Sequence, residues 1–434
     1  MSTLAERATA WADGSWDEGR SLLWNPPGSF DELTPPRSLH MVPQSAWYAV
    51  GLLMRGDAAR AERVLHALCS LQYDRPGVVW HGTFARFAEW PDPPDADAVE
   101  WVDYNPNWRQ FVGTTFALIL RSFPVSADLE ARMRHAIDLA IAGEPRDRVP
   151  PGYSNIALMK AWLEADESYA QAIVEVFDEH GAFEEYGSPT YYGIDLLALA
   201  LWRQHPPTPH FAEWGQRLWS VLWADIARWW HPGLRNLCGP YSRAYGMDMS
   251  GDVGLLGLWM PEPAMPSLGA PFGHSHDMTM APLVQLLGGG PIDAKLSDEE
   301  RVVEQQLPGG RTATGWLAPG VMAGGERGAP FRAEGQFHPA TAHWAMPGGS
   351  VGWLRLRHRG RVSATATEGV LTVEVHDHHR LGRQPVMVDT SHGGELGARR
   401  WTLPGRTIAY DGPPADADGV IDAGESETLT LRFR

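Results

Sequence analysis

Cysteine, lysine and long apolar runs are all scarce in this chain of 434 residues. The two cysteines, Cys69 and Cys238, are too few for a disulfide scaffold or for a metal site built from thiolates. No stretch approaches the roughly 20 apolar residues that span a bilayer. No basic segment followed by an apolar run is visible near Met1, so we expect no secretory signal and a cytoplasmic location.

The balance of charge is strongly acidic, and lysine contributes almost nothing to it. With 36 basic and 53 acidic residues the formal net charge is −17, and the only lysines are Lys160 and Lys295. Nucleic acid and anionic membranes both require positive potential, so neither is an expected partner. An acidic ligand would need a local basic site, and arginine suits such a site because its planar guanidinium binds carboxylates in bidentate fashion.

Tryptophan, by contrast, is abundant, with 20 residues beside 11 tyrosines and 13 phenylalanines. Aromatic side chains offer flat apolar faces of the kind that line a carbohydrate cleft, although dense helix packing is an alternative use for them. Hydrophobic residues make up 44% and charged residues 21%, which is typical of a globular protein and excludes a disordered or fibrous chain.

The first 290 residues show apolar positions spaced by three and four, the pattern of amphipathic helices. It predicts helices at 45–54, 58–71, 108–122, 126–142, 155–164, 167–178, 191–203 and 211–230, and no strands. Short turns join these helices in pairs, which fits a closed α/α toroid or an open α-solenoid. Because polar and aromatic residues gather in alternate loops, which would share one rim, we predict a toroid over residues 1–290.

The period changes after a predicted linker at 291–310. Short segments of alternating hydrophobicity, separated by Gly, Pro and Asp turns, predict an antiparallel β-sandwich over 311–434. The predicted fold is therefore mainly α plus β, with an N-terminal (α/α) toroid that carries the catalytic site and a C-terminal antiparallel β-sandwich.

Arg109 lies in the first turn of the helix predicted at 108–122, where the helix dipole disfavours a cation. It therefore needs a partner, either a buried carboxylate or an acid group of a ligand. We predict that Arg109 anchors an acidic sugar, with Asn107 and Trp108 beside it. Asn107 or Asp103 is alternatively the cap of that helix.

Asn155 follows Tyr153 and Ser154 at the start of the next predicted helix. An amide at the rim of a cavity hydrogen-bonds a sugar carboxyl group without adding charge, so Asn155 is a candidate for that role. Helix capping by Ser154 or Asn155 is the alternative.

The ten residues Phe183–Tyr192 contain two adjacent carboxylates and three tyrosines. Ser188 followed by proline is a favourable helix start, which accounts for those two positions without any function. It does not account for the carboxylates and tyrosines, so we predict that Glu185, Tyr191 and Tyr192 line a cavity.

Tyr241 and Tyr245 both lie close in sequence to Arg243, in a segment with little apolar periodicity. A neighbouring cation lowers the pKa of a phenol toward the working pH, so either tyrosine is a candidate general acid or base. Packing of both tyrosines in a core is the alternative.

The histidines give weaker signals. Residues 273–277 and 376–379 contain metal-compatible side chains, but neither segment has a spaced further ligand, so we predict no cofactor, with a divalent metal ion as the less favoured alternative. His81 and His338 are predicted to reach the substrate. No nucleophile elbow, phosphate-binding loop, dinucleotide fingerprint or zinc-protease motif occurs in the chain.

Paired helices followed by an antiparallel β domain, with Asn155 at a helix start and Arg243 between two tyrosines, resemble the α/α-toroid polysaccharide lyases. These are the alginate, hyaluronan/chondroitin and heparinase II/III-like groups. The resemblance implies that Asn155 neutralises a uronate carboxylate, that Tyr241 or Tyr245 is the acid or base, and that Arg243 is its electrostatic partner. Those families often use a histidine as well. No Asn-His dipeptide occurs here, so the base stays unassigned.

The expected activity is β-elimination on an acidic oligosaccharide or polysaccharide, in which the enzyme stabilises the enolate-like intermediate by contacts to the carboxylate. Two alternatives remain open. A glycoside hydrolase would need two carboxyl groups about 5–10 Å apart, for which Glu185 with Asp248 or Asp103 are candidates. A carbohydrate-binding protein would need only the aromatic cleft. The oligomeric state cannot be predicted.

Overall fold

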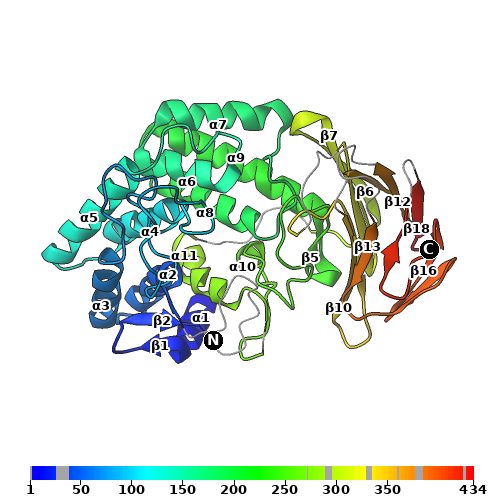
Figure 1. Cartoon of the computed structure of the whole chain (residues 1–434), viewed down its shortest axis with the longest axis horizontal. Coiled ribbons are helices and arrows are strands. Elements are labelled where there is room, and N and C mark those ends of the chain that lie inside the picture. The colour runs from blue at the N-terminus through cyan, green and yellow to red at the C-terminus, as the bar shows by residue number, and fades with distance from the viewer. Residues whose placement is uncertain are drawn as a thin grey trace. The chain divides into compact units, whose positions relative to one another are not determined.

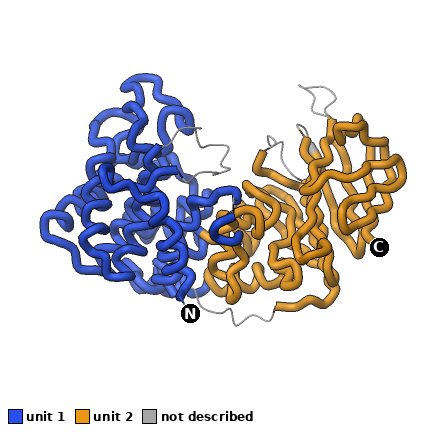
Figure 2. The backbone as a smooth tube through the Cα atoms, turned by 90° about the horizontal axis from the view of Figure 1, so that it is seen from below, with its two compact units in different colours: residues 1–174, 194–217, 266–290 blue, residues 175–193, 218–265, 291–434 orange. Residues whose placement is uncertain are grey.

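The computed structural model describes residues 2–25, 39–270, 272–288, 296–328, 335–358, 361–376, 385–423 and 427–434. The chain divides into two compact units (Figure 2). Unit 1 comprises residues 1–174, 194–217 and 266–290, and unit 2 comprises residues 175–193, 218–265 and 291–434. This division differs from the predicted domains 1–290 and 311–434, because two segments of the helical half pack with the sheets.

Unit 1 is built from paired helices, several of which lie side by side in Figure 1. They include α1 (Leu4–Ala12), α2 (Val42–Met54), α3 (Ala58–Cys69), α4 (Trp108–Ser122), α5 (Ala127–Ala142), α6 (Ser154–Glu164) and α11 (Ala281–Leu286). Helix α2 pairs with α3 and α4 pairs with α5, while α2, α4 and α6 contact one another in succession.

Burial separates these helices into two layers. In α2 every residue from Val42 to Leu53 is buried, whereas α3 buries only the stripe Ala61, Val64, Leu65 and Leu68. Helix α2 is therefore an inner helix and α3 an outer one, with the solvent-facing side that its spacing of three and four residues predicts. This alternation is the paired-helix arrangement expected from the sequence.

Each of three helices has one part in unit 1 and the other part in unit 2. They are α7 (Glu167–His180), α8 (Tyr191–Gln204) and α9 (Pro209–Trp229). The helical half also contains the short helices α10 (Leu256–Trp259) and η3 (Ser275–Met280). The prediction of no strands before residue 290 was wrong, because short strands occur at β1 (Trp16–Asp17), β2 (Leu22–Trp24), β3 (His40–Met41), β4 (Trp230–His231) and β5 (Asn236–Leu237). Each has only two or three residues, too few to show a period of two.

Two antiparallel sheets form the C-terminal β-sandwich, as predicted (Figure 1). The seven-stranded sheet has the order β17 (Val420–Ile421), β13 (Val386–Thr390), β10 (Val351–His358), β9 (Ala340–Ala345), β8 (Val321–Arg327), β7 (Arg311–Ala318) and β6 (Arg301–Leu307). The six-stranded sheet has the order β11 (Arg361–Thr367), β12 (Val370–His376), β18 (Thr428–Arg432), β16 (Arg406–Asp411), β15 (Arg400–Leu403) and β14 (Glu395–Leu396).

Strand β6 corrects the predicted linker at 291–310, because residues 301–307 pair along their whole length with β7. The side chain of Arg301 donates to the carbonyl of Trp230 at 2.7 Å, which ties this edge strand to the end of α9 within unit 2. Between the sheets, alternate residues of β12, β15 and β18 are buried. These residues, which include Trp401 of β15, pack with Trp316 of β7 and Trp344 of β9 into one apolar core.

The opposite face of the seven-stranded sheet is also covered, since β7 is buried at every position and β8 and β9 at nearly every one. The segment of unit 2 that begins at Cys238 covers this face. It lies so close to β8 that a Cβ atom added to Gly324 would be 1.8 Å from the carbonyl oxygen of Gly239. The Cys238 thiol meets the carbonyl oxygen of Ala323 at 3.4 Å. The sheet therefore fixes the start of the segment that carries Tyr241, Arg243 and Tyr245.

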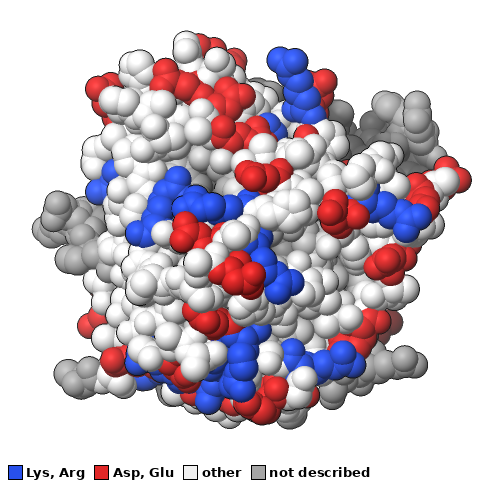
Figure 3. All heavy atoms as spheres, turned by 90° about the vertical axis from the view of Figure 1, so that its left-hand side faces the viewer, with Lys and Arg blue, Asp and Glu red and all other residues white. Residues whose placement is uncertain are grey.

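Within the described residues, we find no helix with the length and apolar character needed to cross a bilayer. Acidic and basic side chains are interspersed on the face of the molecule that Figure 3 shows, and they do not gather there into one basic surface.

Candidate functional site

Two loops of unit 2 that are far apart in sequence lie side by side through backbone contacts. The amide of Ser242 donates to the carbonyl of Tyr186 at 3.0 Å. The hydroxyl of Ser188 donates to the carbonyl of Arg243 at 2.5 Å and accepts from the amide of Tyr191 at 3.0 Å. Ser188 therefore caps the start of α8, as its sequence context predicts, and also holds the Arg243 loop against it.

A third segment pairs with the Arg243 loop as a short strand would. Tyr241 and His338 exchange both backbone hydrogen bonds, at 3.0 and 2.8 Å, and the amide of Ala244 donates to the carbonyl of Gln336 at 2.9 Å. This pairing fixes the backbone on both sides of Arg243 and places its side chain beside that of Gln336.

The guanidinium of Arg243 joins all three segments (we call Glu185, Tyr191, Arg243, Tyr245 and Gln336 the tyrosine–arginine cluster). Its Nε donates to Gln336 Oε1 at 2.8 Å, Nη1 to Glu185 Oε1 at 2.9 Å and Nη2 to the Tyr191 hydroxyl at 3.0 Å. The guanidinium carbon also lies 4.7 Å from the centre of the Tyr191 ring, within cation–π range. The side chain of Arg243 is 30% exposed and that of Glu185 11%, so part of this charge faces solvent.

The hydroxyl oxygens of Tyr191 and Tyr245 lie 2.8 Å apart. Arg243 can only donate, so the Tyr191 oxygen accepts from it, and the proton of Tyr191 is available to the Tyr245 oxygen. Burial, followed by the neighbouring Tyr245, raises the pKa of Tyr191 well above its ordinary value, and Arg243 opposes that rise. Tyr191 therefore keeps its proton, and it is a hydrogen-bond donor toward Tyr245.

Tyr241 and His338 do not belong to this cluster, contrary to prediction, because both are completely buried. The Tyr241 hydroxyl donates to the carbonyl of Leu237 at 2.5 Å, and burial raises its pKa well above the ordinary value. His338 accepts from Arg355 at 3.1 Å, and burial followed by the charge of Arg355 lowers its pKa to about 3. Both side chains are therefore engaged in the interior of unit 2 beside the paired backbone.

Tyr192 is likewise part of the interior rather than of a cavity wall. Its hydroxyl and that of Tyr186 approach the two oxygens of Asp225, at 3.5 and 2.9 Å, and both rings are buried. Burial raises the pKa of Asp225 to about 6, against the hydrogen bond from Tyr186, which lowers it.

Asp248 is the second carboxyl group of interest in unit 2. It accepts from the amide and the hydroxyl of Ser250 at 2.9 and 2.5 Å, and burial nevertheless raises its pKa. Glu185, by contrast, is paired with a guanidinium. Burial therefore favours the protonated form of Asp248, whereas Glu185 lies beside a positive charge. Asp103, the other candidate, belongs to unit 1.

The residues predicted to contact a sugar near 107 and 155 belong to unit 1, and Arg109 lies there in a buried ion-pair network. Arg109 is completely buried, donates to the carbonyl of His81 and lies 3.7 Å from Glu144. Burial lowers the pKa of Arg109 to about 10, and Glu144 opposes this. The predicted partner of Arg109 is therefore the carboxylate of Glu144. The prediction that Arg109 anchors an acidic sugar was wrong.

Other predicted contacts in unit 1 are also engaged with the protein. The side-chain amide of Asn107 donates to the Tyr153 hydroxyl at 3.3 Å, and it makes no capping bond to α4. Asn155 is completely buried, so it does not form the rim of a cavity. The His81 ring accepts from the amide of Arg75 at 3.0 Å, and the Trp108 ring packs 5.5 Å from that of Phe111.

Site residues were predicted in four segments, around residues 107–109, 155, 185–192 and 241–245. The first two segments belong to unit 1 and the last two to unit 2. Residues 107–109 meet residue 153 in unit 1, and residues 185–191 meet residues 241–245 in unit 2. Their convergence on one hollow stays a prediction. Sequence reasoning missed Gln336, although it singled out His338 two residues later. It also missed Glu144, whose only signal was the cation in the first turn of α4.

One group of three metal-compatible side chains, His274, His276 and Asp277, lies within the described part of unit 1. The other sequence candidate, at 376–379, falls mostly outside the described residues, which include only His376.

The chain matches the model of a family described as a domain of unknown function, DUF8769, over residues 2–288. This match covers more than half of the chain, and the protein belongs to that family. It includes Glu185, Tyr191, Arg243 and Tyr245 and ends before the β-sandwich. No curated protein matches the chain.

Proposed function

We propose that the protein is a carbohydrate-active enzyme that cleaves uronate-containing oligosaccharides or polysaccharides by β-elimination at the tyrosine–arginine cluster. The observation that carries the proposal is the hydrogen-bonded chain from Arg243 through Tyr191 to Tyr245. Tyr245 in this chain is partly exposed to solvent.

In the proposed reaction Tyr245 acts as a phenolate. Its oxygen removes the proton from C5 of the uronate, the C5 electrons form the C4–C5 double bond, and the bond from C4 to the leaving oxygen breaks. The same proton then passes from Tyr245 to the leaving oxygen, which restores the phenolate. The donor proton of Tyr191 and the charge of Arg243 stabilise that phenolate, since hydrogen bonds and cations favour the charged form of an acid.

Arg243 has a second role in this scheme. Its partly exposed guanidinium supplies positive charge for the uronate carboxylate as negative charge develops on it. Glu185 and Gln336 are positioning residues, because each accepts a hydrogen bond from Arg243 and so fixes its plane. This takes over the neutralising role that the sequence assigned to Asn155.

Glycoside hydrolysis is the second candidate, and the contrast between Asp248 and Glu185 favours it. Asp248 has a raised pKa, as a general acid requires, and Glu185 is ion-paired with Arg243 at 2.9 Å. Neither group needs the tyrosine pair, so the two mechanisms predict different sensitive residues.

A panel of uronate oligosaccharides tests both proposals. β-Elimination gives products with a C4–C5 double bond that absorb in the ultraviolet, whereas hydrolysis gives new reducing ends without that absorbance, and a binding protein gives neither. We expect ultraviolet-absorbing products and a loss of about 100-fold or more in kcat for Tyr245→Phe. Tyr241→Phe is the matched control, because it removes a buried hydroxyl outside the cluster. Unchanged turnover by Tyr245→Phe would overturn the proposed mechanism.

A further inference from the structure

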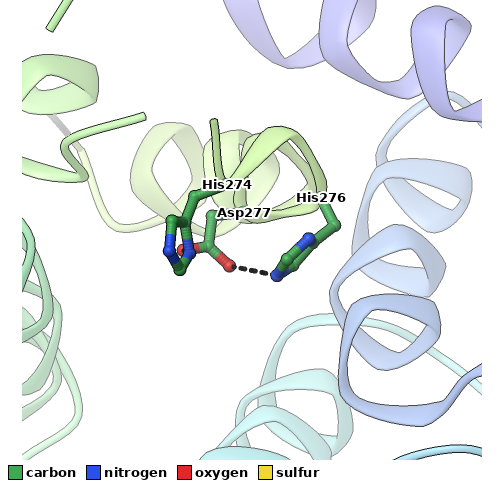
Figure 4. Close-up of side chains that lie close together, drawn as sticks. All are labelled: His274, His276 and Asp277. Atoms are coloured by element: carbon green, nitrogen blue, oxygen red, sulfur yellow. Dashed lines mark ion pairs between the residues drawn. The ribbon is translucent and has the colours of Figure 1, made fainter. Parts of the chain in front are cut away.

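The short helix η3 and His274, which directly precedes it, carry three side chains that converge without serving the proposed function. The geometry points to a binding site for one divalent transition-metal ion, of the zinc class, formed by His274, His276 and Asp277. One ligand atom from each residue lies within 4.8 Å of the others. In Figure 4 all three side chains project from the same segment, with the carboxylate between the two rings.

Local backbone geometry accounts for this convergence. The amide of Asp277 donates to the carbonyl of His274 at 3.0 Å, and a 3₁₀-helix places side chains three residues apart on the same side. His274 has φ of 50° and ψ of 36°, a left-handed conformation that is uncommon for a residue with a Cβ atom. Residues held in such conformations gather at ligand-binding positions, where surrounding structure over-determines them.

The separations match those of ligands around one ion. His276 Nε2 lies 3.4 Å from Asp277 Oδ1, and His274 Nδ1 lies 3.7 Å from Asp277 Oδ2. Both distances exceed the usual 2.7–3.2 Å of a hydrogen bond between nitrogen and oxygen. Two ligands that are each about 2.1 Å from a tetrahedral ion lie roughly 3.4 Å apart. Both rings therefore approach the carboxylate, each toward a different oxygen, at separations close to those of two ligands that share one ion.

The donor types indicate which ion fits. Imidazole nitrogens suit zinc, copper, iron and nickel, whereas magnesium and calcium take oxygen ligands. The side chains of His276, His274 and Asp277 are 8%, 13% and 14% exposed, so the site is shielded and still reached by solvent. Three protein ligands leave a fourth position for water or a ligand, as in catalytic rather than structural zinc sites. One carboxylate and two neutral imidazoles leave a net charge of +1 on the bound ion.

The test uses the full chain, freed of metal with a chelator and dialysed. Zinc should bind in one equivalent by titration calorimetry, with a rise in Tm, whereas magnesium at the same concentration should leave Tm unchanged. Cobalt(II) should bind in its place and give the visible absorption of a tetrahedral or five-coordinate centre. A parent chain that binds no stoichiometric zinc or cobalt overturns the proposal.

His276→Ala and Asp277→Asn locate the site. Both should weaken zinc binding, His276→Ala by more than the roughly 10–100-fold that outer-shell changes produce, because it removes a ligand, and Asp277→Asn because it replaces a charged carboxylate by a neutral amide oxygen. Asp277→Asn keeps the shape of the side chain, so it serves if His276→Ala fails to fold. His135→Ala, an exposed histidine on α5, is the control and should bind zinc as the parent does. Parental zinc affinity and cobalt spectrum in Asp277→Asn would overturn the assignment.

Discussion

The hydroxyl oxygens of Tyr191 and Tyr245 lie 2.8 Å apart, although the two residues are separated by more than 50 positions in the chain. The contact depends on Ser188, which both starts α8 and binds the carbonyl of Arg243. Arg243 in turn donates to Tyr191. The tyrosine pair is thus fixed from the side of Tyr191, whose hydroxyl meets that of Tyr245.

A double-mutant cycle tests this contact without a substrate. Tyr191→Phe and Tyr245→Phe should destabilise the chain non-additively, with a coupling free energy of about 1 kcal/mol for the lost hydrogen bond. The free energy of unfolding in urea gives all four corners of the cycle. Tyr410→Phe combined with Tyr191→Phe is the control, because the Tyr410 hydroxyl donates to the carbonyl of Pro413 and not to the cluster. Additive effects for the first pair would contradict the geometry.

The ion pair between Arg243 and Glu185 should have an asymmetric effect on stability. Arg243→Met leaves a nearly buried carboxylate without its cation, and we expect a loss of about 2 kcal/mol. That is less than the 3–5 kcal/mol of a fully buried pair, because Arg243 is 30% exposed. Adding Glu185→Gln to Arg243→Met should recover more than half of the loss, since the uncompensated charge disappears. Urea unfolding of the two variants measures this, and a double variant that is less stable than Arg243→Met would contradict it.

Local signals predicted the elements well. The spacing of apolar residues predicted a helix at 108–122, and α4 has those bounds. The sandwich predicted over 311–434 is likewise present, and β16 at Arg406–Asp411 is one of its strands. Strand β6 was missed because its sequence, Arg-Val-Val-Glu-Gln-Gln-Leu, shows almost no alternation of apolar and polar residues. Only Val303 and Leu307 of this strand are buried. Its place in the sheet comes from pairing with β7, which no local pattern encodes.

The site was predicted only in part, because burial is decided by contacts distant in sequence. Arg243 and Tyr245 were found from their neighbours in the chain. Tyr241, like Tyr245, lies two residues from Arg243, but its ring is buried against Ala244, Met247 and His343. Arg109 gave a clear local signal of a missing partner, but the sequence could not tell Glu144 from a ligand.

The structural role of Glu144 gives a prediction for unit 1. Glu144 accepts from Arg148 at 2.7 and 2.9 Å and lies 3.7 Å from the completely buried Arg109. Glu144→Gln should cost about 3–5 kcal/mol in the free energy of unfolding, because it leaves a buried cation uncompensated. Glu130→Gln is the matched control: Glu130 pairs with Arg134 on the surface of α5, and its loss should cost less than about 0.5 kcal/mol. A similar small loss for Glu144→Gln would show that Arg109 does not need its carboxylate.

Asp225 should make stability fall as the pH rises. Its pKa is about 6 in the folded chain, against 3.8 as the ordinary value. At pH values well below 3.8 the carboxyl is protonated in both the folded and unfolded states and contributes no difference. Between pH 3.8 and 6 the folded chain holds more protons than the unfolded chain, so the free energy of unfolding decreases with rising pH in this window. Above pH 6 the decrease is complete, at about 3 kcal/mol.

Asp225→Asn removes this titration while keeping one oxygen to accept from Tyr186. The stability of the variant minus that of the parent should therefore rise by about 2.4 kcal/mol from pH 4 to pH 7. Urea unfolding of both chains at unit steps of pH measures the difference, in which titrations shared by the two chains cancel. Asp128→Asn, on the exposed side of α5, controls for the loss of a carboxylate as such. A difference that stays constant from pH 4 to pH 7 would mean that Asp225 is ionised across the whole window. Its desolvation would then be outweighed by the hydrogen bond from Tyr186 and the charge of Arg228.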